Sequence, residues 1–168
     1  MKKYIVDLDN TLVFTNRLNN EAYNYALYKI GKRKIKSTGR ITRQEVFRSV
    51  DLTEKEKEKL VKIKQEYFIN NLDKIEVNQK LLALLEKEGR ENCVLWTRAE
   101  PTRVEPILLY YDLRNKFSYI YYSEKKELQK DMDHICTIVG CDNKELIIFD
   151  DELKAIKGKS FLEIKRTE

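Results

Sequence analysis

The chain has few of the residues that break or cross-link a fold. Its 168 residues include only two prolines and five glycines, and we find no internal repeat and no low-complexity tract. This composition argues against a flexible linker between domains. The three cysteines, Cys93, Cys136 and Cys141, have neither the spacing of a metal site nor that of a disulfide framework. We therefore expect reduced thiols in a cytoplasmic protein.

Long apolar runs are also missing. No run approaches the roughly 18 apolar residues of a membrane span, and Asp7 and Asp9 interrupt the apolar part of the N-terminal segment. We therefore expect neither a membrane span nor a signal peptide. Hydrophobic residues make up 42% of the chain and charged residues 36%, which is typical of a soluble globular protein. The net charge of +5 permits an anionic partner but does not demand nucleic acid, and the oligomeric state stays open.

The spacing of apolar residues predicts two kinds of segment. Short apolar runs predict strands at residues 4–8, 93–97, 117–123, 145–151 and 160–165. Residues 18–88 read as almost entirely helical, with capping boxes that begin at Thr42 and Thr53. Beyond residue 90, strands alternate with helices. This order predicts an α/β fold, a Rossmann-like parallel sheet with helices on both faces.

Polar side chains gather where the predicted strands end. Asp7 and Asp9 close the first strand, and strand alternation would put them on one side of it. Thr97 ends the second strand, and Asp150 and Asp151 end a later one. Ligands of open parallel sheets bind beyond the carboxyl ends of the strands, so these residues should share one crevice. Carboxylates that repel each other there make sense with a divalent cation among them.

Four short motifs give the sequence a resemblance to a known family. The segments DLDNT, VLWT, KDM and LIIFDD occur in the order of the four motifs of the haloacid dehalogenase superfamily, which they resemble. The resemblance implies a catalytic core at residues 1–14 and 90–168. It also implies a small all-helical cap at residues 15–89, inserted after the first strand.

The resemblance implies a role for each aspartate. Asp7 would be the nucleophile that attacks phosphorus, and Asp9 the general acid and base. Thr97 would hydrogen-bond a phosphate oxygen. Because Asp9 is present, the chain is similar to members that transfer phosphoryl groups rather than to those that cleave carbon–halogen bonds. The implied cofactor is Mg²⁺, and its implied ligands are Asp7, the main-chain carbonyl of Asp9, Asp150 and Asp151.

The family also uses a lysine beside the nucleophile. Lys125, Lys126 and Lys130 all lie in the right interval. We favour Lys130, because KDM resembles a sequence that opens the helix before the last motif, and Lys126 is the second choice. Asn10 and Arg98, which adjoin the motif aspartate and threonine, are the further candidates for binding the substrate.

The resemblance predicts a Mg²⁺-dependent phosphatase that acts on a small phosphorylated metabolite, such as a nucleotide or a sugar phosphate. Three alternatives remain open: phosphoryl transfer to an acceptor other than water, removal of phosphate from a nucleic-acid end, and a non-enzymatic binding module. A basic run without acidic residues permits the nucleic-acid alternative, although most such runs are solvated surface. It comprises Lys29, Lys32, Arg33, Lys34, Lys36, Arg40 and Arg43.

Overall fold

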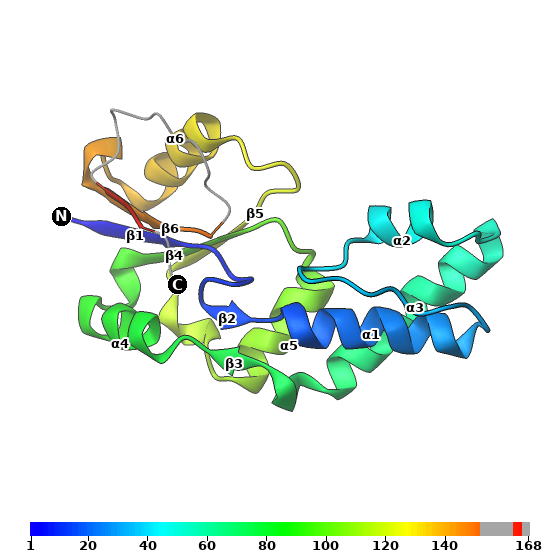
Figure 1. Ribbon diagram of the computed structural model, residues 1–168. Coiled ribbons are helices and arrows are strands. Elements are labelled where there is room, and N and C mark those ends of the chain that lie inside the picture. Colours follow the sequence, from blue (N-terminus) through cyan, green and yellow to red (C-terminus); the bar gives the residue numbers. More distant parts are fainter. Residues whose placement is uncertain (152–162, 166–168) are drawn as a thin grey trace. The chain divides into compact units, whose positions relative to one another are not determined.

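The computed structural model describes residues 1–151 and 163–165, and it forms two compact units (Figure 1). The core unit consists of Met1–Phe14 and Val77–Glu168, and the helical unit is Thr15–Glu76. Two short strands, β2 (Val13–Phe14) and β3 (Glu76–Val77), pair with each other where the chain passes from one unit to the other. Within the described ranges, no helix combines the length and apolar character needed to cross a membrane.

The core unit is built on a parallel five-stranded sheet in the order β5-β4-β1-β6-β7. In the central strand, Val6 lies opposite Leu95 on one side and Phe149 on the other. Residues 160–162 of the last predicted strand lie outside the described part of the chain. The strands are β1 (Lys3–Val6), β4 (Cys93–Thr97), β5 (Tyr119–Tyr122), β6 (Leu146–Phe149) and β7 (Glu163–Lys165).

Helices cover both faces of this sheet. The helix α6 (Leu128–Val139) packs Met132 and Ile135 against Ile5, Val94 and Trp96 of the sheet. Figure 1 shows α4 (Gln79–Glu88) and α5 (Pro101–Tyr110) on the opposite face. The predicted α/β class and Rossmann-like sheet are therefore confirmed. Short 3-10 helices lie at Arg90–Asn92, Arg114–Lys116 and Asn143–Glu145.

The helical unit has a hydrophobic core of its own. It contains α1 (Asn16–Lys29), α2 (Arg43–Ser49), α3 (Glu54–Asn70) and a 3-10 helix at Leu72–Lys74. At the start of α3, Thr53 and Glu56 form the predicted reciprocal capping box. At the start of α2, the structure gives one of the two predicted bonds, in which Thr42 accepts a hydrogen bond from the Glu45 amide. The core cluster consists of Tyr23, Ala26, Leu27, Ile35, Ile41, Val46, Val50, Leu52 and Leu60.

The helix α4 belongs to the core unit, so the expected boundary at residue 89 is wrong. The change of unit falls between Glu76 and Val77. The N-cap residue Asn78 explains the difference. Its backbone amide donates to the carbonyl of Leu12 (2.7 Å), and its side-chain Nδ2 donates to the carbonyl of Thr11 (3.0 Å). These bonds tie the start of α4 to the loop after β1. The helical periodicity of residues 18–88 could not reveal which helix packs on which core.

Candidate active site

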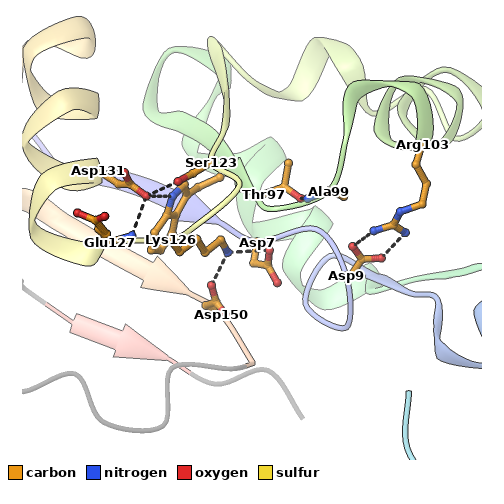
Figure 2. A network of polar contacts seen from close by, with 11 residues as sticks. Asp7, Asp9, Thr97, Ala99, Arg103, Ser123, Lys126, Glu127, Asp131 and Asp150 are labelled. Carbon is orange, nitrogen blue, oxygen red and sulfur yellow. Dashed lines mark hydrogen bonds and ion pairs between the residues drawn. The ribbon is translucent and has the colours of Figure 1, made fainter. Parts of the chain in front are cut away.

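The carboxyl ends of the parallel strands bring the predicted site residues to one edge of the sheet. Asp7 is the first residue after β1, Asp150 is the first after β6, and Thr97 is the last of β4. The amide of Asp7 donates to the carbonyl of Phe149 at 2.9 Å, which fixes the backbone beside Asp150. Figure 2 shows the side chains of Asp7 and Asp150 meeting at one lysine.

Three carboxylates form a group that fits a divalent cation. One oxygen each of Asp7, Asp150 and Asp151 lies within 4.8 Å of the others. Asp7 and Asp150 are buried, and Asp151 is half-buried. Hard oxygen donors at this separation suit Mg²⁺, which prefers carboxylates and retains part of its water shell. The residues present therefore fit the metal that the motifs imply.

Burial of Asp7 makes its negative charge costly. Desolvation raises the pKa of the Asp7 carboxyl to about 7, against the attraction of Lys126, which lowers it, while Asp150 adds repulsion. A carboxylate in this position needs positive charge nearby to stay ionised at neutral pH. Lys126 supplies one such charge, and a cation held by the three carboxylates would supply another.

The lysine that contacts these aspartates is Lys126, our second choice, and not Lys130, which we favoured. The ammonium of Lys126 lies 2.8 Å from Asp7 Oδ1 and 2.6 Å from Asp150 Oδ2. It also lies 4.2 Å from the centre of the Trp96 ring, and its side chain is only 8% exposed. The side chain of Lys130 is 76% exposed and lies 3.9 Å from Glu127. Lys126 precedes α6 in the loop at the carboxyl edge of β5, whereas Lys130 is on the exposed face of that helix.

The buried carboxylate of Asp131 holds the loop that carries Lys126, and sequence reasoning missed it. Its Oδ2 accepts hydrogen bonds from Trp96 Nε1 (2.9 Å), Ser123 Oγ (2.8 Å) and the amide of Glu127 (3.2 Å). These donors come from β4, from the end of β5 and from the residue after Lys126 (Figure 2). Asp131 thus fixes both ends of the loop and the ring on which the lysine lies. The KDM motif contained this aspartate, but its spacing gave no partner.

We expect the substitution Asp131→Asn to lower kcat about tenfold and the free energy of unfolding by about 1–3 kcal/mol, because a neutral amide oxygen accepts the hydrogen bonds of Trp96, Ser123 and Glu127 more weakly than a carboxylate does. Phosphate release and urea unfolding measure the two effects. The matched control is Asp133→Asn, which changes an exposed acid two residues along the same helix. A folded Asp131→Asn variant with unchanged kcat would show that this carboxylate does not position Lys126.

Asp9 lies in a tight turn and faces away from the carboxylate group. The strand β1 ends at Val6, so Asp7 and Asp9 are not on one side of a strand as expected. In the turn after the strand, Asn10 adopts a left-handed conformation (φ 59°), which asparagine tolerates better than most residues. Asn10 thus has a backbone role in the turn, where its amide donates to the Val13 carbonyl at 2.6 Å.

Arg103 of α5 binds the Asp9 carboxylate with both terminal nitrogens, and nothing in the sequence motifs indicated this contact.

Thr97 is buried at the end of β4, and its hydroxyl accepts a hydrogen bond from the backbone amide of Ala99 at 3.1 Å. Because the hydroxyl accepts in this bond, it can still donate its own proton. Arg98, the other expected substrate-binding residue, is exposed to solvent.

Comparison with known proteins agrees with this geometry. A family model described as "Haloacid dehalogenase-like hydrolase" matches residues 4–166. A "predicted phosphoglycolate phosphatase" from Haemophilus somnus superposes with a TM-score of 0.77 at 19% sequence identity, over 90% of this chain and 77% of that chain. CbbY from Rhodobacter sphaeroides, solved in complex with phosphate, gives a TM-score of 0.73 at 17% identity, over 100% of this chain and 88% of that chain. No curated protein sequence matches the chain significantly.

The solved structures agree in fold at low identity, whereas the family model matches the sequence itself. That match begins at β1 and runs through the helical unit to the last strand. The four motifs lie within it, and the structure places three of them at strand ends and one at the start of α6. The chain therefore belongs to the haloacid dehalogenase-like hydrolases.

Proposed function

We propose that the chain is a Mg²⁺-dependent phosphatase that hydrolyses a phosphate monoester of a small metabolite through a phosphorylated Asp7. The observation that carries the proposal is the meeting of Asp7, Lys126 and Asp150 at the carboxyl edge of the sheet. This edge is where ligands of open parallel sheets bind. A carboxylate held beside a lysine and two further carboxylates suits attack on phosphorus better than it suits a purely structural ion pair.

In the first step, an oxygen of Asp7 attacks phosphorus and the bond to the leaving oxygen breaks. A divalent cation on Asp7, Asp150 and Asp151 would offset the repulsion between the anionic nucleophile and the phosphate when it is bound. Lys126 stabilises negative charge on the phosphoryl oxygens, and the hydroxyl of Thr97 donates to one of them. Asp9 gives a proton to the leaving oxygen.

In the second step, water attacks the phosphorylated aspartate and restores Asp7. Asp9, having lost its proton to the leaving group, now accepts one from that water. The step releases inorganic phosphate and returns both aspartates to their starting states. The same two carboxylates therefore serve both halves of the reaction, and Asp7 needs no separate base because a carboxylate is a nucleophile once ionised.

Two observations favour a small phosphorylated substrate. The structural relatives include a protein named as a phosphoglycolate phosphatase, and a variant of CbbY was solved with xylulose-1,5-bisphosphate. Part of the basic run also has internal contacts: Arg33 donates to the carbonyl of Ser49 (2.8 Å), and Arg40 donates to Thr15 Oγ1 (2.9 Å). These arginines support the helical unit's own loops, which weakens the case for a nucleic-acid surface.

Metal removal is the direct test of this function. We expect the purified chain to release phosphate from members of a panel of sugar phosphates and nucleotides in Mg²⁺, and EDTA to lower the rate at least about 100-fold, because the charge between nucleophile and phosphate is then not offset. Added Mg²⁺ should restore the rate. Full activity in EDTA, or no release from any ester, would contradict the proposal. Faster release from phosphorylated oligonucleotides, falling steeply with salt, would instead support the nucleic-acid alternative.

A further inference from the structure

Arg103 makes a two-point contact with Asp9. Its Nη1 donates to Asp9 Oδ1 at 2.8 Å, and its Nη2 is in close contact with Asp9 Oδ2. The side chains of Arg103 and Asp9 are 13% and 19% exposed, so both charges are largely withdrawn from water but still accessible. Figure 2 shows the pair beside the contact of Asp7, Lys126 and Asp150, with Asp9 directed at Arg103. A planar guanidinium binds a phosphate or another carboxylate with the same two-point geometry.

This contact engages both oxygens of a carboxylate that the proposed reaction needs elsewhere. Asp9 binds Arg103 as a carboxylate, so it must turn toward the leaving oxygen and take up a proton from water before it can act as the acid. Breaking this pair costs free energy, because both charged groups are largely withdrawn from water. An anion delivered by the substrate would remove this penalty, because it would take the place of Asp9 on Arg103.

We propose that Arg103 determines specificity by receiving a second anionic group of the substrate, a carboxylate or a further phosphate, and that this exchange releases Asp9 for proton transfer. The inference rests on the proposed phosphatase function and narrows the substrate class to phosphate monoesters with a second anionic group close to the ester. A monoester with a neutral remainder leaves Arg103 on Asp9 and is therefore a poor substrate.

The competing interpretation is that the pair only anchors α5 to the loop after β1. A second arginine offers a matched control for that role. Arg114 lies 3.6 Å from Glu105 of α5, and both side chains are about half exposed. The substitution Arg114→Gln removes an arginine–carboxylate pair from the same helix without changing the contacts of Asp9.

The kinetic test compares substrates that differ in one group. They are 2-phosphoglycolate, which carries a carboxylate, 2-hydroxyethyl phosphate, which carries a hydroxyl, and ethylene glycol bisphosphate, which carries a second phosphate. We expect the wild type to prefer an anionic substrate in kcat/KM, and Arg103→Gln to reduce this preference about 10- to 100-fold, the range for hydrogen bonds to a charged group. Arg114→Gln should keep the preference. Comparing kcat/KM for the two anionic substrates shows whether Arg103 prefers a carboxylate or a second phosphate. An unchanged preference in Arg103→Gln overturns the inference, because an anchor alone would affect all substrates equally.

A binding measurement separates this inference from the phosphatase proposal. Titration calorimetry on the Asp7→Asn protein in Mg²⁺ needs no turnover. Adding Arg103→Gln should weaken the affinity for 2-phosphoglycolate about tenfold or more and spare that for 2-hydroxyethyl phosphate. If this difference appears but the wild type hydrolyses nothing, the phosphatase proposal fails and the anion receptor stands. Equal affinity for the two ligands, or no binding of 2-phosphoglycolate, overturns the receptor.

Discussion

The substitution Asp7→Asn is expected to lower phosphate release at least about 10⁴-fold on every ester that the wild type hydrolyses, because the amide cannot form the phosphorylated intermediate. The two side chains have nearly the same shape, so the loss should come from chemistry rather than from packing. Steady-state kinetics with saturating Mg²⁺ measures it. A variant with wild-type kcat would show that another group attacks phosphorus.

The same substitution should not destabilise the fold in metal-free buffer. Burial raises the pKa of Asp7 from 3.8 to about 7, so the folded state loses stability as pH rises between these two values, and the full penalty is present above pH 7. A neutral asparagine removes this pH-dependent penalty, although Lys126 then keeps only Asp150 as an ionised partner. Thermal unfolding at pH 8 should therefore occur at an equal or higher temperature in the variant. A large fall in the unfolding temperature would mean that lost structure contributes to the lost activity.

The second large effect is expected from Lys126→Met, which keeps an unbranched apolar side chain and removes the ammonium group that lies over the Trp96 ring. We expect kcat to fall about 10²- to 10³-fold, the loss typical when a preorganised electrostatic contact in a water-poor site is removed. Phosphate release over a range of substrate concentrations separates this fall in kcat from any change in KM.

Lys130→Met is the matched control for this experiment, because it removes the same charge from an exposed position four residues away. Its kcat should stay within about twofold of the wild type. Equal losses in the two variants would mean that overall charge, rather than contact with Asp7, is what matters. A loss confined to Lys130→Met would restore the lysine that the motif resemblance favoured.

The sequence predicted the sheet well because the relevant signals are local. Apolar runs at residues 93–97 and 145–151 required burial on both faces, and polar residues directly after such runs had to lie at the carboxyl edge. Asp7, Thr97 and Asp150 could be assigned to one site on this basis alone. The class of fold and the catalytic edge thus follow from patterns a few residues long.

The contacts made by charged side chains could not be predicted in this way. Which lysine reaches Asp7 depends on where α6 begins: Lys126 lies in the loop before Leu128, and Lys130 lies on the helix. Arg103 meets Asp9 across 94 positions in the sequence, and Asp131 meets Trp96 across 35. No periodicity encodes such distances. These are the residues through which a shared site can differ between members of one family.

The central position of β1 has a consequence for how the chain folds. The strand β1 has Cys93 and Ile147 opposite Tyr4, so it must wait for two segments much later in the sequence before its backbone hydrogen bonds can form. The helical unit, in contrast, is one continuous segment with its own hydrophobic core. We infer that this segment can become structured while the ribosome still makes the rest, and that the sheet closes last. Because non-local pairing is slow, completion of the sheet should limit the rate at which the molecule reaches its native state.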